Sequence, residues 1–489
     1  FRRERGGTEL GYRAIASDAE QTVKSACAPS FSKNSRWLLY TVSGDTACAA
    51  GGGGGRAGRG GGGLLGRVGG RGGPSRNRVG IVDLRTGTTT TLQETQSYVL
   101  SKDGMHVALR RYSAGRNGRG ADLTIRNLEQ GTEVSFGNVA DFAWSDNGAL
   151  LGMTIDVDGK IGNGVQLYDA ATGSVKSLDA VEGKYSNLVW RPHSTDLVVL
   201  RSRTDSAFAD TSEVVIAWRG LGMPKQTKTV YDFSADNAFP KGMRVASYRA
   251  PQWPDDGGTL FFGIPPREPK ASSGRGSAQP ARVEVWHWKD LREYHQQDRQ
   301  SAQDRTKTHL VAWSLASNKL ARLADDSIDN VQLSANGKAA IATDEDPYFT
   351  EIISGRQYRD VYRVDVSTGK REKVISKSPF NATISPDGRY AMYTQGGQWW
   401  SYDLSSGARA NLTAKIASVF VDMEDDHPVA ERRPYGPVSW VTGGKSVLLY
   451  DRFDVWQVNA DGSNPVRLTR GKEDTTVYRV QRLDPEART

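Results

Sequence analysis

The chain has 489 residues, of which 37% are hydrophobic, and its formal net charge is +8 at neutral pH. The 12 Trp and 18 Tyr residues supply apolar bulk for a large core. No stretch approaches the roughly 20 continuous apolar residues of a membrane-spanning helix, so we expect no membrane span.

Two cysteines, Cys27 and Cys48, flank a predicted strand near the N-terminus. One pair at this spacing matches no metal motif. The sequence leaves open whether the two form a disulfide or remain free buried thiols. No other pattern predicts a resident cofactor or metal, and we expect none.

The positive charge is concentrated in residues 51–78, which hold six arginines, no acidic residue and many glycines. A Gly/Arg segment can bind RNA. It is also too poor in apolar groups to form a packed core. We favour a low-complexity insertion between two strands and do not expect nucleic acid as a partner.

One pattern recurs along the chain: an apolar or aromatic residue, then often Ser, then a short turn rich in Asp, Asn and Gly, then an apolar strand. Asp-Gly and Asn-Gly pairs supply the positive φ that tight hairpin turns require. The eight copies have turns at Asn34-Ser35, Asp103-Gly104, Asn147-Gly148, His193-Ser194, Asp256-Gly257, Asn336-Gly337, Asp387-Gly388 and Gly443-Gly444.

A second hairpin follows most copies and consists of a strand ending in Asp or Asn, a turn ending in Gly, and another strand. The clearest turns end at Gly87, Gly173, Gly369, Gly407 and Gly462. Two linked hairpins form a four-stranded antiparallel blade. We therefore predict an all-β fold, a β-propeller of eight four-stranded blades, in a single domain over residues 1–489. Because the first and last copies are weak, seven blades is the main alternative.

Two segments between blades depart from this pattern. The Ser/Gly/Pro-rich run 265–282 is predicted to be a loop, where added length costs little free energy. The polar, Gln-rich stretch 291–304 is predicted to be an exposed loop or a short helix. The acidic run 422–428 contains His427 and is interpreted as a solvated loop, because its spacing matches no metal cage.

The C-terminal third resembles bacterial proteins of the prolyl oligopeptidase family. The resemblance is carried by the segments 285–290, 358–362, 385–390, 434–440 and 448–457, of which the last two are the most specific. It covers roughly residues 280–485. The resemblance implies the N-terminal propeller of a serine peptidase of the dipeptidyl-peptidase IV and acylaminoacyl-peptidase type, in which an α/β-hydrolase domain follows the propeller.

That hydrolase domain is not expected within these 489 residues. Its nucleophile elbow would read Gly-x-Ser-x-Gly, and no such pentapeptide occurs. Nor does the alternation of helices and parallel strands that such a domain needs. We predict no catalytic residue in this chain, so any hydrolase activity would belong to a separate chain, a cleavage product or a further region.

Two groups of residues are candidates for contact with a hydrolase domain or a substrate channel. Trp286, His287 and Trp288 could line such a channel, although packing in a blade core is the favoured interpretation. Arg452 and Asp454 could pair across a blade edge or contact the hydrolase domain, and the sequence does not decide between these roles.

The leading hypothesis is therefore the non-catalytic propeller of an exported prolyl oligopeptidase-like serine peptidase. It would dock a catalytic α/β-hydrolase domain or chain and gate the access of peptides, in the periplasm or outside the cell. The alternative is a stand-alone TolB-like propeller, a module that binds another protein on one face.

Overall fold

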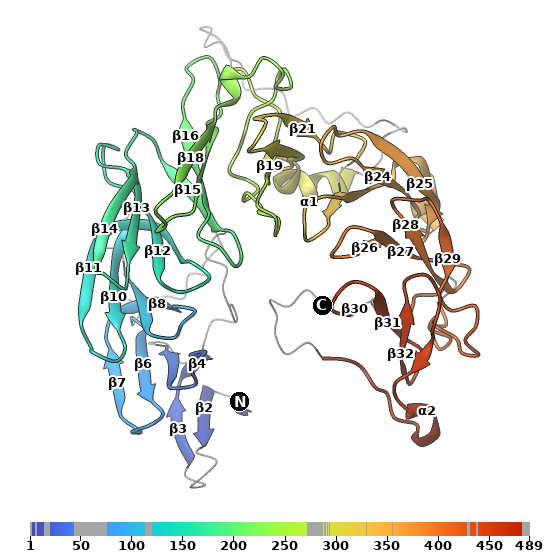
Figure 1. Ribbon diagram of the computed structural model, residues 1–489, viewed down its shortest axis with the longest axis horizontal. Helices are drawn as coiled ribbons and strands as arrows, with labels where there is room; N and C mark the ends of the chain where they lie inside the picture. The colour runs from blue at the N-terminus through green and yellow to red at the C-terminus, as the bar shows by residue number, and fades with distance from the viewer. Residues whose placement is uncertain are drawn as a thin grey trace. The chain divides into compact units, whose positions relative to one another are not determined.

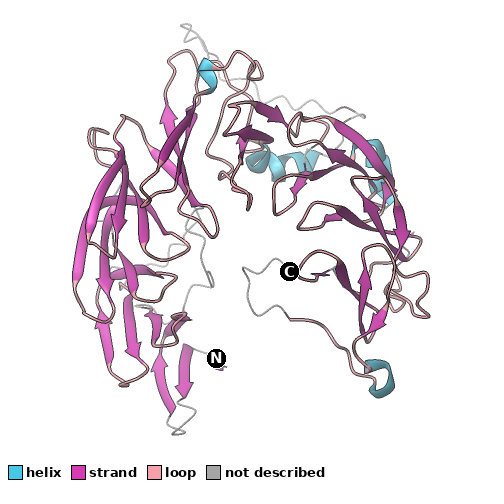
Figure 2. Ribbon diagram, viewed as in Figure 1, coloured by secondary structure: helices cyan, strands magenta, loops and turns pink. Residues whose placement is uncertain are grey.

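The computed structural model describes residues 2–4, 7–13, 20–43, 76–112, 120–270, 287, 290, 292, 294–328, 330–354, 356–427, 431–436 and 439–481. Regular structure in these residues is mostly β (Figure 2). The contacts divide the chain into two compact units. The first comprises Phe1–Thr204 with Thr211–Asp232, and the second comprises Asp205–Asp210 with Phe233–Thr489.

The first unit consists of antiparallel sheets that follow one another along the chain (Figure 1). The first sheet contains β1 (Arg2–Glu4), β2 (Gly7–Arg13) and β3 (Glu20–Lys24). The second contains β4 (Ala26–Phe31), β5 (Trp37–Val42), β6 (Arg78–Asp83) and β7 (Thr89–Leu92). The last contains β15 (Tyr185–Trp190), β16 (Leu197–Arg203), β17 (Ser212–Arg219) and β18 (Thr227–Tyr231).

Between these lies a seven-stranded sheet. Its members are β8 (Thr95–Leu100), β9 (His106–Arg111), β10 (Ala121–Asn127), β11 (Glu133–Trp144), β12 (Leu150–Ile155), β13 (Gly164–Asp169) and β14 (Ser174–Asp179). The 12-residue strand β11 pairs with β10 up to Val139 and with β12 from Val139 onward, with a register shift before Asp141. This sheet is therefore two four-stranded blades that share one strand.

The second unit continues the series with shorter inner strands. Its first sheet has three strands, β19 (Thr259–Ile264), β20 (His309–Ser314) and β21 (Leu320–Arg322). A β-bridge also joins Gln252 to Phe261 of β19. The next has β22 (Asn330–Leu333), β23 (Ala340–Asp344), β24 (Arg359–Val364) and β25 (Arg371–Ser378). Then come β26 (Thr383–Ile384), β27 (Tyr390–Gln395), β28 (Gln398–Asp403) and β29 (Arg409–Asn411). The last has β30 (Ser439–Trp440), β31 (Ser446–Tyr450), β32 (Val455–Asn459) and β33 (Val466–Arg467).

Helices in the described residues are few and short. They are the 3₁₀ helices η1 (Phe233–Ala235) and η2 (Asp346–Ser354) and the α-helices α1 (Tyr294–Asp304) and α2 (Gly471–Asp474). Helix α1 lies in the polar stretch 291–304, which the sequence predicted to be either an exposed loop or a short helix. The structure shows that it is a helix.

The hydrophobic core lies between successive sheets. One buried cluster combines Met392 and Trp399 of one sheet with Val447 and Leu449 of the next. Another joins Val361 to Tyr393 across the preceding pair of sheets. Sheets that bury both faces against their neighbours are typical of propeller blades. The predicted all-β propeller fold with four-stranded antiparallel blades is confirmed, and the number of blades remains a prediction.

The predicted turns all have the left-handed backbone that the Gly and Asn signals indicate. Seven of the eight have one residue with positive φ, and in the last turn both Gly443 and Gly444 have it. The residues of the first seven are Ser35, Gly104, Gly148, His193, Gly257, Gly337 and Gly388. In the fourth turn this residue is His193 rather than Ser194, so a bulky side chain holds the left-handed position there.

The two predicted insertions lie largely outside the described residues. Of the segment 51–78, only residues 76–78 are described, and Arg78 already begins β6. Of the loop 265–282, residues 265–270 are described. Within them Pro266 and Pro269 form bridges to Met243 and Phe208, and Arg267 pairs with Asp205 at 2.8 Å.

Candidate functional site

The blade turns are built by a repeated set of side-chain hydrogen bonds. In the clearest copy the Ser385 hydroxyl donates to Asp387 Oδ1 at 2.5 Å and accepts the Tyr390 N–H at 2.9 Å. Asp387 Oδ1 also accepts the Arg389 N–H at 3.1 Å. The same bonds recur in the turns that begin at Ser32, Ser101, Ser145 and Ser334. Ser followed by Asp or Asn two residues later is therefore a turn-forming pair.

In the second unit, hydrogen bonds join three of the predicted turns in succession. The Asp255 N–H donates to Ala335 O at 3.0 Å, and the Ala335 N–H donates to Pro386 O at 3.0 Å. The side chain of Asn336 adds a bond from Nδ2 to Asp387 O at 2.8 Å. We call these linked turns, at residues 254–257, 334–337 and 385–388, the turn series. It fixes the relative positions of three blades at one end of their inner strands.

Beside the turn series lies a hollow of about 290 Å³, which we call the inner-strand hollow. It is lined by Gln252, Trp253, Pro254, Phe261, Gln332, Leu333, Ser334, Ala335, Ile384, Ser385, Pro386 and Trp440. These residues come from the inner strands and turns of consecutive sheets, so the repeat itself creates the site. Eight of the twelve lining residues are apolar, four carry an amide or hydroxyl group, and none is ionisable.

Two polar side chains of this lining have distinctive surroundings. Gln332 Oε1 accepts the main-chain N–H of Ile384 at 2.9 Å and so caps a neighbouring inner strand. Trp440 is 8% exposed, and its indole N–H is buried with no hydrogen-bond partner. An unsatisfied buried donor is uncommon in folded proteins.

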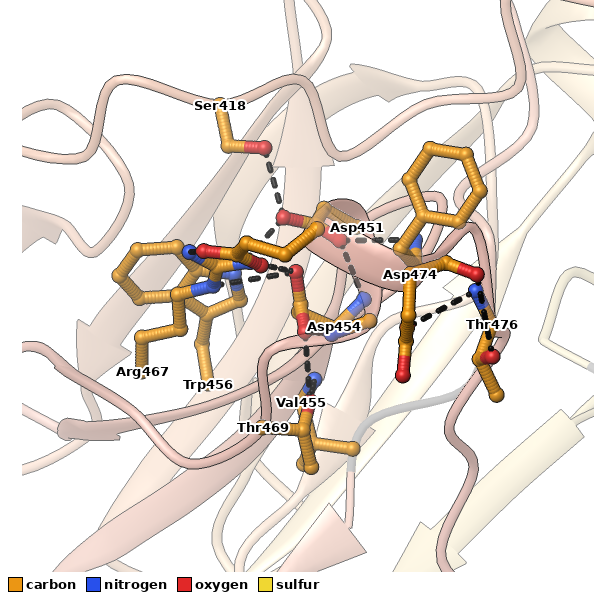
Figure 3. Close-up of polar contacts among 12 residues, drawn as sticks. Ser418, Asp451, Asp454, Val455, Trp456, Arg467, Thr469, Asp474 and Thr476 are labelled. Atoms are coloured by element: carbon orange, nitrogen blue, oxygen red, sulfur yellow. Dashed lines mark hydrogen bonds and ion pairs between the residues drawn. The ribbon is translucent and has the colours of Figure 1, made fainter.

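The predicted candidates Arg452 and Asp454 lie in the last blade, between β31 and β32. Asp454 is one of two buried carboxylates there, and Asp451 is the other (Figure 3). Asp451 accepts four hydrogen bonds. They come from the main-chain N–H groups of Phe453 at 2.9 Å and Asp454 at 2.6 Å, from Trp456 Nε1 at 2.8 Å and from the Ser418 hydroxyl at 2.7 Å. These bonds fix the turn between β31 and β32.

Asp454 is 1% exposed, and four donors reach its carboxylate. Its Oδ1 accepts the Thr469 hydroxyl at 2.7 Å and the Gly471 N–H at 2.6 Å, and its Oδ2 accepts Arg467 Nη2 at 2.6 Å and Nε at 3.0 Å. Burial acts to raise the pKa of Asp454, but the bonds from Thr469, Gly471 and Arg467 outweigh it and hold the pKa below its ordinary value. Glu473 pairs with the same guanidinium at 2.5 Å.

Arg452 has a different partner. It is half exposed, pairs with Glu424 and lies over the Phe453 ring at 4.8 Å. One of the predicted roles requires Arg452 and Asp454 to pair with each other. The structure gives them different partners instead. Asp454 is used entirely within its own blade, whereas Arg452 lies at the surface.

The other predicted residues are only partly described. His287 is exposed, and its main-chain N–H donates to Asp290 Oδ2 at 3.0 Å. Trp286 and Trp288 lie outside the described residues, so their roles remain predictions. Cys27 is disulfide-bonded, while Cys48 lies outside the described residues, and the pairing of these two also remains a prediction.

The acidic run near His427 forms a surface cluster. The potential ligand atoms of Asp425, Asp426 and His427 lie within 4.8 Å of one another. His427 Nδ1 is 2.5 Å from Asp425 Oδ1, and Asp426 is fully exposed. Exposed acidic groups of this kind are common without a metal ion, so we assign no metal site to them. In the described part of the chain, no helix is long and apolar enough to cross a membrane.

No family model matches the chain, and no curated protein matches it. Similar solved structures include the β-propeller domain of the Trilobed protease from Pyrococcus furiosus. Its sequence is 10% identical, the match covers 79% of this chain and 94% of that chain, and the TM-score is 0.32. A prolyl endopeptidase structure has 11% identity, 82% and 51% coverage and a TM-score of 0.33. TolB from Acinetobacter baumannii has 13% identity, 76% and 82% coverage and a TM-score of 0.23. At these values the likeness carries no information on activity or ligand.

The inner-strand hollow was not predicted from the sequence. Its lining residues are distributed over four repeats, and only the folded chain brings them together. One signal was present: Trp253 and Trp440 occupy the same place in their repeats, immediately before the turn. Two aromatic residues at equivalent inner positions could have indicated a shared apolar site.

Proposed function

We propose that this chain is the non-catalytic propeller portion of a prolyl oligopeptidase-like serine peptidase. In this role it docks a catalytic α/β-hydrolase domain or chain and limits the size of the peptides that reach it. The resemblance of residues 434–440 and 448–457 to that family supports the relation. We further propose an exported protein that works in the periplasm or outside the cell.

The observation that carries the docking role is the turn series. Main-chain hydrogen bonds between Asp255, Ala335 and Pro386 join three consecutive turns, and Asn336 adds a side-chain bond to Asp387. Bonds between backbones hold their geometry without ordering long side chains, which would cost conformational entropy. Such a rim offers a fixed surface on which a second domain can dock.

The first test treats the purified chain with a fluorophosphonate probe, which labels activated serines. Activation requires a neighbouring general base and an oxyanion hole. In the described structure the turn serines Ser334 and Ser385 instead donate to Asn336 and Asp387. We expect no labelled serine in residues 1–489, and a labelled serine would refute the non-catalytic role.

The second test adds this chain to an α/β-hydrolase from the same gene neighbourhood and compares cleavage of a short peptide with cleavage of a folded protein. The proposal predicts that the chain suppresses cleavage of the folded protein while sparing the peptide. If neither rate changes and the two proteins do not associate, the stand-alone TolB-like binding module becomes the better interpretation.

A further inference from the structure

The inner-strand hollow has the composition of a site for an uncharged ligand. Trp253, Phe261, Leu333, Ile384 and Trp440 supply much of its apolar wall, and no Asp, Glu, Lys, Arg or His lines it. A charged group bound there would lose its hydration without gaining a partner of opposite charge, which is strongly unfavourable. An apolar group would instead gain free energy by leaving water.

The indole of Trp440 differs from its counterparts in other repeats. Trp144 and Trp190 also stand immediately before their turns, and each donates its indole N–H to the preceding blade. Trp144 donates to Val99 O at 3.3 Å, and Trp190 donates to Ala143 O at 2.8 Å. The N–H of Trp440 has no such acceptor. The indole hydrogen bond to the preceding blade is therefore present at Trp144 and Trp190 but absent at Trp440, beside the hollow.

Three other polar side chains of the lining, those of Ser334, Ser385 and Gln332, also favour a ligand that accepts hydrogen bonds. The hydroxyls of Ser334 and Ser385 donate within their own turns. Gln332 uses its carbonyl oxygen to accept the Ile384 N–H, so its NH₂ group is the part that can serve a ligand. Gln332 and Trp440, the side chains that carry these two donors, both belong to the lining of the hollow.

The strands around the hollow favour an extended peptide. Strands β22, β26 and β30 each lie at the edge of their sheet, with a sheet neighbour on one side only. Main-chain groups on the free edge of a strand can pair with an added extended chain. A peptide can thus place one side chain in the hollow and run its backbone along these edges.

We propose that the inner-strand hollow binds one apolar side chain of an uncharged, extended peptide segment, whose main-chain carbonyl groups accept hydrogen bonds from Gln332 and Trp440. The volume of about 290 Å³ lies at the small end of ligand pockets and suits a single large side chain with its adjoining peptide unit. This inference requires no catalytic domain, so it stands or falls independently of the proposed function.

The test measures binding of capped pentapeptides, Ac-Ala-Ala-X-Ala-Ala-NH₂, to the full chain by isothermal titration calorimetry. We expect the peptides with X = Leu or Phe to bind at least about tenfold more tightly than those with X = Lys or Glu, because a buried unpaired charge is costly. A photo-leucine version should crosslink to residues 252–254, 332–335, 384–386 or 440. Equal affinities across the series, no binding of any peptide at millimolar concentration, or crosslinks confined to other segments would overturn the proposal.

Two variants test the donors. W440F keeps an aromatic ring but removes the indole N–H, and we expect it to weaken binding about fivefold, as the loss of one hydrogen bond does. The matched control W190F removes an indole N–H that is already bonded to Ala143 and should leave the affinity unchanged. Q332E keeps the acceptor for Ile384 but replaces the donor with a charge, and it should abolish binding.

A third variant tests the space itself. Ala335 lines the hollow, and its main-chain bonds to Asp255 and Pro386 do not involve its side chain. A335F should fill the hollow and prevent crosslinking, with a circular dichroism spectrum like that of the parent chain. If W440F, Q332E and A335F all bind the Leu peptide as the parent does, the peptide binds elsewhere and the proposal is wrong.

Discussion

Asn336 Nδ2 donates a hydrogen bond to the main-chain oxygen of Asp387, 2.8 Å away, and so ties the turn of one blade to the turn of the next. Asn336 Oδ1 meanwhile accepts the Ser334 hydroxyl and the Lys338 N–H within its own turn. The two ends of one amide thus serve two blades, which an aspartate in the same position could not do.

The variant N336D separates these two tasks. Aspartate keeps the acceptor for the turn but loses the donor to Asp387 O, so we expect unfolding in urea to show a loss of about 1 kcal/mol in stability. The reverse change, D387N, keeps the acceptor that its own turn uses and should cost clearly less. Equal losses for the two variants would show that the bond between the turns contributes nothing.

Gly337 is required both for its backbone angle and for space. Its φ is +69°, and a Cβ added there would lie 2.4 Å from Cβ of Pro254 in the preceding turn. Gly87 has a similar φ of +74° but no atom within 4 Å of such a Cβ. We expect G87A to cost about 1 kcal/mol from the left-handed backbone alone. G337A should cost at least about 1 kcal/mol more because it also overpacks the contact between turns.

Thermal or urea unfolding of the two glycine variants provides this comparison directly. The difference between them isolates the close approach of adjacent turns, since the backbone angle is nearly the same in both. If G337A is no less stable than G87A, the turns of the series are further apart than the structure places them.

Asp454 should contribute to the acid sensitivity of the last blade. A carboxyl group with a lowered pKa in the folded state stabilises the fold fully above its unfolded pKa of about 3.9, and this stabilisation is lost as the pH falls through the lower folded value. The variant D454N loses the charge that faces Arg467, so we expect a stability loss of about 2 kcal/mol at neutral pH. Its stability should then fall less than that of the parent chain below about pH 4.

The control for this prediction is D298N, a change at an exposed position of α1. Urea unfolding at pH 7 and at several lower pH values gives the stability curves. Parallel curves for D454N and the parent chain would contradict the role given to the buried carboxylate.

The Gly/Arg segment lies outside the described residues, and its dispensability remains a prediction from composition. Residues 51–74 are mostly Gly and Arg, which can bury little apolar surface. Deleting them should shift the thermal midpoint, followed by circular dichroism, by only a few degrees. A large decrease would mean that the segment packs against the folded chain.

The sequence predicted those parts of the fold that local chemistry determines. The Asp-Gly and Asn-Gly pairs at Asp103, Asn147, Asn336 and Asp387 predicted the hairpins correctly, because positive φ is confined largely to such residues. The N-terminal sheet β1–β3 was not predicted, because it has no copy of the repeat. The sharing of β11 by two blades was also missed, because each half of the strand has an ordinary strand pattern.

The functional residues were harder to predict because they depend on contacts between distant segments. Arg452 and Asp454 are two residues apart, yet their partners, Glu424 and Arg467, lie in different loops and strands. Charge and spacing alone could not distinguish these partners from a direct Arg452–Asp454 pair. The donors on Gln332 and Trp440 likewise belong to one hollow only after the blades have stacked.

The shared strand β11 has a consequence for how the first unit comes apart. Stacked repeats commonly unfold one at a time, since each contacts only its neighbours. Here β10 and β12 pair with the two parts of β11, which meet at Val139. If β11 unfolds together with either blade, the other blade therefore loses its pairing with this strand. Amide protons from β8 to β14 should accordingly exchange with solvent in a single opening event, making these seven strands one foldon.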